Sequence, residues 1–398
     1  MGKDLRKTGL AAAGLLVVAV MVIWPRDIFQ AASTGLAVWL EILVPALFPF
    51  FLMSNILMGL GVVHALGVLL EPLMRPVFNL PGPAALVMTI GYSTGAPAAA
   101  QFTAQLYREG LCEAGEAARL VAFTTNASPL FILGAVAVGM YASPEIGQTL
   151  ALSHYLANLI LGLLWRFWPN KDTAACSLRT NLGPWQLLRQ ARTALLRARQ
   201  SDTRPPGQIL GEAINTSFRT LITVGGFVIL FAVVIEVLNL LGIIAAISAL
   251  LAIPLGWLGL DAGLADAISR GLFEMTLGVK AAATSSAPLG DRILATSLIL
   301  GWAGLSVHAQ VAGVLDQTPI SSLPFLITRA GHSVLATFLA LLLAPLAQPA
   351  ITIFPRPGGL ALPLIAHYLW QQLIWMALAV TLALVASLAI QTASRIRN

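Results

Sequence analysis

The sequence predicts an all-α polytopic membrane protein with two inverted-topology repeats, re-entrant helical hairpins and broken transmembrane helices. Of 398 residues, 58% are hydrophobic and 10% are charged, whereas soluble domains carry about 25% charged residues. Apolar runs reach the roughly 18 to 20 residues needed to cross a bilayer, and no alternating strand pattern accompanies them, so helices are the expected spanning elements. The clearest runs cover 8–25, 147–165, 221–240, 325–347 and 368–391.

The first predicted element is an N-terminal transmembrane helix over residues 1–27. Basic residues precede an apolar run that ends at Ile23, as in a secretory signal. The following Trp24-Pro25-Arg26 offers no small-residue cleavage site, and many spans follow. We therefore interpret this segment as a retained helix.

Basic residues predict the orientation of the chain. Seven of the 23 Lys and Arg lie between Pro169 and Gln208, three lie in the first seven residues and two in the last four. The positive-inside rule places these three regions in the cytoplasm. Within the basic loop, 169–208, apolar and arginine residues alternate at helical spacing over 184–199, which predicts an amphipathic helix on an anionic lipid surface. We expect no nucleic-acid partner.

An internal repeat organises the rest of the chain into two copies, 28–168 and 209–350. The stretch GYSTG (91–95) is echoed by GLFEMTLG (271–278), and TTNASPLFILGAV (124–136) by GWAGLSVHAQVAGV (301–314). The offset stays near 180 residues, and His154 pairs with His332. The first copy starts outside and the second inside, so the copies run in opposite directions, as in secondary transporters. A C-terminal segment, 351–398, adds a last transmembrane helix and a short tail.

Each copy is expected to contain one re-entrant hairpin and one broken helix. The hairpins cover about 84–107 and 263–285, with tips at GYSTGAP (91–97) and TLGVK (276–280). The broken helices cover about 114–141 and 290–315, interrupted at NASP (126–129) and GLS (304–306). Irregular backbone at membrane depth must be buried in protein or line a watery cavity. The alternatives are close helix packing through Gly91-x-x-x-Gly95, and satisfaction of the freed backbone groups by neighbouring helices.

Polar residues at these interruptions are the predicted substrate site. Opposed half-helix N-termini at one plane would suit a carboxylate, and ionisable residues inside a bilayer are functional candidates. Glu274 is the candidate for a coupling ion, H+ or Na+. Glu41 and Glu236 occupy corresponding helices and are left without a role, while His154 and His332 are expected near helix starts at the interface. The predicted substrate-binding residues are Ser93, Thr94, Gly95, Asn126, Ser128, Thr276, Gly278, Lys280, Ser306, His308 and Gln310.

The sequence contains no enzyme signature that we can identify. It lacks a Ser/His/Asp set, an HExxH motif, paired catalytic carboxylates and a Walker sequence. The two cysteines, Cys112 and Cys176, have no metal-motif spacing. We expect a protein that is not an enzyme, with no cofactor and no bound metal.

The motifs carry a family resemblance. LVPALFPFFLMSNIL (43–57), GYSTGAP, FTTNASPLFILGAV, GLFEMTLGVKA and GLSVHAQV resemble the YlbJ (SpoVV-type) sporulation integral membrane proteins, which contain the nucleoside-recognition or Gate domain. The resemblance spans about residues 35–340. It implies movement of dipicolinic acid across the outer forespore membrane. The family tip is commonly GYPSGA, whereas here the proline stands at Pro97.

Three functions follow as alternatives. The first is a carrier for a small organic anion that works by an elevator-like motion of 84–141 and 263–315 against the remaining helices. The second is an ion-coupled nucleoside transporter, because Gate domains also occur in nucleoside transporters and iron permeases. The third is a non-transporting scaffold that acts through the basic loop. The sequence leaves open whether the chain forms a homo-oligomer in the bacterial membrane.

Overall fold

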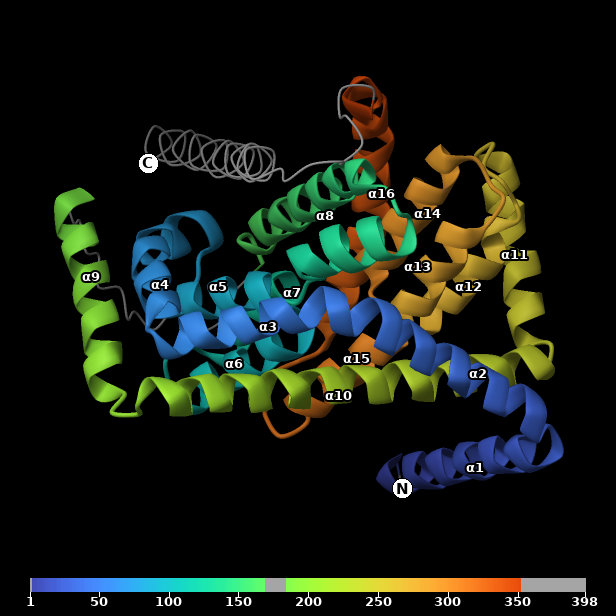
Figure 1. Ribbon diagram of the computed structural model, residues 1–398, viewed down its shortest axis with the longest axis horizontal. Helices are drawn as coiled ribbons and strands as arrows, with labels where there is room; N and C mark the ends of the chain where they lie inside the picture. Colours follow the sequence, from blue (N-terminus) through green and yellow to red (C-terminus); the bar gives the residue numbers. More distant parts are fainter. Residues whose placement is uncertain (1, 169–183, 352–398) are drawn as a thin grey trace.

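The protein is helical throughout the described residues. The computed structural model describes residues 2–168 and 184–351, and no strand occurs in these two ranges (Figure 1). The first part contains α1 (Gly2–Ile23), α2 (Pro25–Ala37), the π-helix η1 (Val38–Leu43), α3 (Val44–Gly59), α4 (Val62–Leu73), η2 (Met74–Phe78), α5 (Ala84–Thr94), α6 (Ala96–Arg108), α7 (Ala114–Thr124), η3 (Phe131–Met140) and α8 (Pro144–Trp165). The second part contains α9 (Pro184–Ser201), α10 (Pro206–Leu240), α11 (Ile243–Trp257), α12 (Leu264–Phe273), α13 (Met275–Thr284), α14 (Leu289–Trp302), α15 (Gly304–Leu315) and α16 (Leu323–Ile351).

Five helical segments of the described chain are long and apolar enough to cross a membrane, which establishes an integral membrane protein. Three of them contain the predicted runs 147–165, 221–240 and most of 325–347. The run 8–25 falls mainly in α1, which ends before a separate α2, and 368–391 lies outside the described residues. The five segments are Pro25–Gly59, Pro144–Trp165, Pro206–Leu240, Leu289–Leu315 and Leu323–Leu343.

Two 35-residue helical segments lie side by side in opposite directions. One is the continuous α2-η1-α3 segment and the other is α10. Phe48 packs against Phe218 with tilted rings whose centroids are 4.6 Å apart, and Trp39 donates its indole N–H to the Leu221 carbonyl at 2.8 Å. Ile28, near the start of the first segment, packs in a cluster with Val237, near the end of the other. A helix of this length measures about 52 Å, so it is tilted or extends beyond a hydrocarbon core of about 30 Å.

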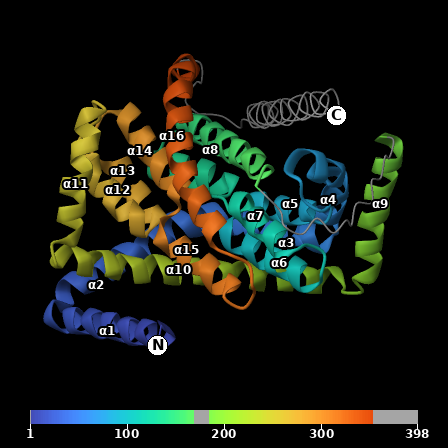
Figure 2. The ribbon, with the colours of Figure 1, turned by 180° about the vertical axis from the view of Figure 1, so that it is seen from behind.

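The order of elements after each long segment is the same, apart from the π-helix η2, which extends α4 and has no counterpart after α11. A two-residue turn ending in a glycine with positive φ, Gly61 or Gly242, leads into a short apolar helix, α4 or α11. Next come two short helices separated by one residue, α5 and α6 or α12 and α13, and then two helices separated by a break. A longer helix, α8 or α16, comes last. We call α4 to α8 the first series and α11 to α16 the second series. Figures 1 and 2 show α4 with α9 at one end of α10 and α11 at the other.

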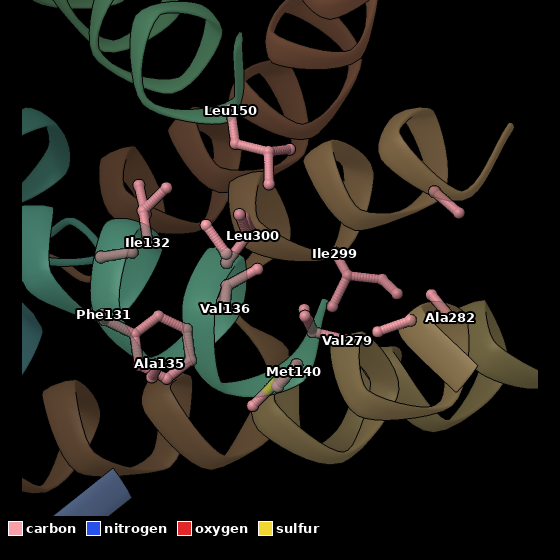
Figure 3. Packing of buried hydrophobic residues seen from close by; sticks show 14 of the residues in the cluster. Phe131, Ile132, Ala135, Val136, Met140, Leu150, Val279, Ala282, Ile299 and Leu300 are labelled. Carbon is pink, nitrogen blue, oxygen red and sulfur yellow. The ribbon is translucent and has the colours of Figure 1, made fainter. Parts of the chain in front are cut away.

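The two series pack crosswise against each other. In one hydrophobic cluster, η3 contacts α13 and α14: Val136 and Met140 lie beside Val279 and Ile299 (Figure 3). In a second cluster, α15 packs on α6, and Val311 is buried there with Leu120 of α7. The second helix of each broken pair is therefore held by the other series.

The last helices of the two series, α8 and α16, pack directly together. His154 and His332 meet in this contact, and both are buried within the helices. The expectation that they lie near helix starts at the interface is therefore wrong. The two histidines are buried because α16 packs against α7, α8 and α14.

Candidate functional site

Each hairpin turn rests on the break of the helix that follows it. At the first turn, Gly95 has φ +94°, and a Cβ built on it would lie 3.4 Å from the Asn126 carbonyl oxygen and 3.7 Å from the Ser128 nitrogen. At the second break, Gly304 has φ +76°, and a Cβ there would lie 2.8 Å from the Met275 nitrogen. Only glycine adopts these backbone conformations without strain. Glycine at both positions therefore permits contact between the turn and the break.

The first break leaves the C-terminal carbonyls of α7 without helical partners. Residues 125–128 are not helical. Asn126 donates to the Phe123 carbonyl at 2.9 Å, and Ser128 Oγ accepts from the Phe131 N–H at 3.3 Å. Tyr155 donates from α8 to the Ala127 carbonyl at 2.9 Å. Neighbouring side chains thus satisfy part of the break, while Asn126 Oδ1 is buried without a partner among the described residues.

The second turn lies at Glu274, earlier than the expected tip at 276–280. Glu274 is extended, with φ −140° and ψ 119°, and its carboxylate accepts the Leu277 N–H at 2.7 Å and the Thr276 hydroxyl at 3.2 Å. This carboxylate therefore caps the N-terminus of α13. Thr276, Gly278 and Lys280 consequently fall inside α13 rather than in an open loop.

Close contact also explains Gly278. A Cβ built on Gly278 would lie 2.3 Å from the Gly271 Cα, so α12 and α13 touch through their backbones. Gly278 therefore serves helix packing in this structure, and its backbone faces the neighbouring helix.

Two predicted hydroxyl residues, Ser93 and Thr94, bond to their own helix. Ser93 donates to the Thr89 carbonyl at 2.7 Å and Thr94 to the Ile90 carbonyl at 2.8 Å. Both are half-buried. These bonds use the hydroxyl protons locally, so only the oxygen lone pairs stay available to a ligand.

The remaining predicted residues surround the second break and α13. His308 Nδ1 lies 2.8 Å from the Gly304 carbonyl oxygen, and its ring lies 4.4 Å from that of Trp302. Ser306 Oγ is buried and faces the Glu274 carboxyl without a well-formed hydrogen bond. Lys280 and Gln310 are half-buried, and neither side chain makes a hydrogen bond or ion pair within residues 2–168 and 184–351. The structure does not pair Lys280 with Glu274.

A buried polar network behind the first break contains residues that the sequence reasoning missed. Asn158 of α8 donates to the Tyr92 hydroxyl and to the Phe123 carbonyl. Arg329 of α16 donates from Nη2 to Asn158 Oδ1 and to the Ala122 carbonyl, each at 3.2 Å. Arg329 lies in an otherwise apolar span, and a charge inside a span was the signal that could have identified it.

A cavity among the described residues lies elsewhere, beside α9. It measures about 1060 Å³ and opens between α4, α9 and the start of α10. Of its two arginines, Arg204 is paired with both Asp202 and Glu212. The lining also contains Arg197 and Glu71, so its carboxylates outnumber its arginines and it is poorly suited to an anion. None of the predicted substrate-binding residues lines this cavity. The candidate site is therefore the region of the two hairpin turns and the two helix breaks, and the cavity beside α9 is separate from it.

The described ranges hold no group of three His, Cys, Asp or Glu residues arranged to bind a metal ion. The polar groups at the interruptions are amides, hydroxyls, imidazoles and single charges. Such a set suits recognition of a polar organic solute through hydrogen bonds and charge.

Comparison with known proteins gives the family. A family model described as nucleoside recognition matches residues 40–144, which include the first hairpin and break. The sporulation integral membrane protein YlbJ of Bacillus subtilis (strain 168) is 39% identical over 334 residues, covering 84% of this chain and 82% of that protein. An uncharacterised protein of Alkalihalophilus pseudofirmus is 30% identical over 163 residues, covering 39% of this chain and 33% of its own length. No solved structure matches. The extent of the first similarity shows that this chain belongs to the family of the sporulation integral membrane protein YlbJ.

Proposed function

We propose that this protein is a membrane transporter for a small organic anion, held between two hairpin turns and two helix breaks. The observation that carries the proposal is the contact of each turn with the following break, at Gly95 and Gly304. Non-helical backbone at membrane depth is tolerated where protein buries it or where it lines a solute path. Two such places in one chain are typical of secondary transporters.

The proposed architecture is a pair of inverted-topology repeats with re-entrant hairpins. The repeated element order, the antiparallel long helices and the crosswise packing of η3 and α15 support it. A two-fold relation between the repeats would produce each of these three features. The N-terminus, the loop 169–208 and the C-terminus lie in the cytoplasm in this proposal, in accord with their basic residues.

The proposed substrate is dipicolinic acid, a planar dicarboxylate, and the proposed place is the outer forespore membrane. The name of the Bacillus subtilis relative supports a role in sporulation. The candidate site supports an anion: half-helix N-termini, Lys280 and His308 lie at or near the two breaks, and such groups favour carboxylates.

The proposed transport step is an alternating-access, elevator-like movement of 84–141 and 263–315 against the other helices. Small residues at close helix contacts, such as Gly91 and Gly271, support movement of these helices as one unit. Paired cysteines that crosslink the two groups should block transport in this proposal. Full crosslinking with unchanged transport would exclude the movement.

Purified protein in liposomes tests the function. Labelled dipicolinate should enter faster than in empty liposomes, and labelled uridine should not. Uridine is the informative competitor, because the matching family model is described as nucleoside recognition and Asn126, Gln310 and Glu274 offer amide and carboxylate partners. Uptake of uridine without dipicolinate would replace the anion by a nucleoside.

A scaffold role is tested by removing most of residues 172–203. Helix α9 exposes Trp185 and Leu188 together with arginines, so it suits a lipid or partner surface. A carrier should keep most of its transport after this deletion, whereas a scaffold would lose its function. If neither the full-length protein nor the deletion variant transports the substrate and both support sporulation, the protein is neither this carrier nor a scaffold that acts through the loop.

A further inference from the structure

We propose that Arg329 is the fixed positive charge of an anion-binding site behind the first helix break, where it contacts a carboxylate of the substrate. The inference deepens the proposed function and rests on it, because it names the group that would make the site selective for anions. Arg329 lies in α16, outside the hairpins and broken helices from which the sequence predicted the site.

The guanidinium of Arg329 is fully buried and only partly bonded. Its exposed fraction is 0%. An arginine carries five N–H donors. Nη2 makes the bonds to Asn158 and Ala122, whereas Nε and Nη1, which carry the other three donors, have no partner in the described part of the chain. Buried polar groups are normally paired, so these donors point to a missing partner.

No carboxylate compensates this charge in the described ranges. The four ion pairs found there involve Arg75, Arg204 and Arg270, and none includes Arg329. The opposing charge present is the C-terminal end of α7, whose carbonyl at Ala122 accepts from Nη2. A helix terminus carries about half an elementary charge. This partial charge is smaller than the full charge of the guanidinium, so the helix end does not replace a carboxylate partner.

Arg329 lies near groups from the first hairpin turn and from the second helix break. Through Asn158 it is linked to the Tyr92 hydroxyl, which belongs to the first hairpin turn. Its Cζ lies 5.8 Å from the centroid of the Phe325 ring, and the same ring lies 5.0 Å from the ring of His308 beyond the second break. A carboxylate bound here would lie beside groups from both series of helices.

Further unpaired polar atoms lie in the same network. Asn126 Oδ1, both ring nitrogens of His154 and Nδ1 of His332 are buried without hydrogen-bond partners in the residues described. Asn126 belongs to the first break, His332 stands one turn after Arg329 on α16, and His154 stands one turn before Asn158 on α8. These atoms are consistent with a small polar ligand or ordered water that completes the network.

The competing interpretation is that Arg329 only caps α7. The chain offers a matched control in Arg119, a second buried arginine whose Nη2 donates to the Asn79 carbonyl at 3.0 Å and whose Nε and Nη1 also lack partners. Arg119 differs in one respect, because the Glu116 carboxyl lies close enough to interact with it. It should therefore be dispensable for anion binding.

Binding to the purified full-length protein in detergent tests the inference. The probes are dipicolinate, picolinate with a single carboxylate, and uridine, measured by calorimetric titration and by the shift in melting temperature. We expect Arg329→Gln to weaken dipicolinate binding at least tenfold and Arg119→Gln to leave it within twofold. Arg329→Lys keeps the charge with fewer fixed donors and should bind dipicolinate three- to tenfold more weakly than the wild type.

Unchanged dipicolinate affinity in folded Arg329→Gln would overturn the inference, and if that variant does not fold, unchanged affinity in Arg329→Lys would do so. The transport assay separates this inference from the proposed function. Arg329-dependent binding without uptake into liposomes would leave the anion site standing and remove the transporter. Undiminished uptake by the Arg329→Gln variant would support the transporter and exclude Arg329 from the anion site. A wild type that binds no anion would refute the site.

Discussion

His332 Nε2 lies 2.7 Å from the backbone carbonyl oxygen of His154, and the two imidazole rings are 4.3 Å apart. The two residues stand at the same step of the repeated element order, in α8 and α16. Equivalent positions in two copies meet face to face when a two-fold axis passes between them. This contact is therefore the place where the proposed symmetry can be tested most directly.

Replacing His332 should loosen the α8–α16 contact. His332→Ala removes the bond to His154 and empties buried space, so we expect a loss of about 2 kcal/mol in the free energy of unfolding. Thermal melting in detergent measures the change. The control is His64→Ala, because His64 is exposed on α4 and its loss should cost less than about 0.5 kcal/mol. Equal melting temperatures in the two variants would show that the histidine contact contributes nothing.

The turn at Gly95 should not tolerate a side chain. Gly95→Ala forces an L-residue into φ +94°, at a cost of roughly 1 to 2 kcal/mol. The matched control is Gly211→Ala in the second turn of α10, where a Cβ would meet nothing within 4 Å. That change should stabilise by about 0.5 to 1 kcal/mol. Melting temperatures that shift in opposite directions are the expected result, and a shift of Gly95→Ala in the same direction as the control would contradict it.

Glu274 should carry the coupling ion if the transporter is proton-driven. Glu274→Gln preserves an oxygen to accept the Leu277 N–H but removes the ionisable group. We expect uptake driven by an imposed pH gradient to lose its stimulation, while exchange of labelled for unlabelled substrate continues. The control is Glu236→Gln, whose carboxyl lies half-buried beside Asn239 in α10. Stimulation that persists in Glu274→Gln would assign coupling to another group.

Cys112 should react slowly with alkylating agents. It lies between α6 and α7, outside the five candidate spans, and burial, followed by the charges of Glu116 and Glu113, raises the pKa of its thiol to about 12. An ordinary thiol has a pKa of about 8.5. The nucleophilic thiolate is therefore scarce at pH 8, and the stability gained from keeping the thiol neutral declines as the pH rises above about 8.5 towards 12.

The rate of iodoacetamide labelling checks this in a Cys176→Ser background. We expect Cys112 to react at least tenfold more slowly at pH 8 than a cysteine introduced by Glu109→Cys in a Cys112→Ser, Cys176→Ser protein, since Glu109 is exposed. Equal rates would mean that the thiol is open to solvent and normally acidic.

The hairpin ranges that the sequence predicts lie close to the helix ranges in the structure. Hairpins expected over 84–107 and 263–285 correspond to helices covering 84–108 and 264–284. The first turn follows from the local sequence, because Gly95 and Pro97 favour a helix boundary, whereas proline stands inside α3, α4 and α11 without ending them. The second turn was expected too late, at 276–280. Glu274 is extended and caps α13, and a lone carboxylate in an apolar segment looks like a functional charge rather than a helix cap.

The candidate site was less predictable than the elements. Ser93 and Thr94 lie at the end of α5, directly before the first turn, and their hydroxyl protons bond to their own helix. Arg329 was missed because it stands six residues after the start of α16, where an arginine in a sequence resembles an interfacial residue. At the offset that relates His154 to His332, the first copy has Ala151, so no repeat signal marked Arg329 either.

Sequence by itself determined that this chain is a helical membrane protein and where its helices break, since apolar composition and the backbone limits of glycine and proline act within a few residues. Tertiary structure alone decided which polar groups share an interior. Arg329, Asn158 and Tyr92 are far apart in the chain, and their contact depends on how α5, α8 and α16 pack. A charge inside an apolar run is visible in the sequence, but the groups that surround Arg329 are set by that packing.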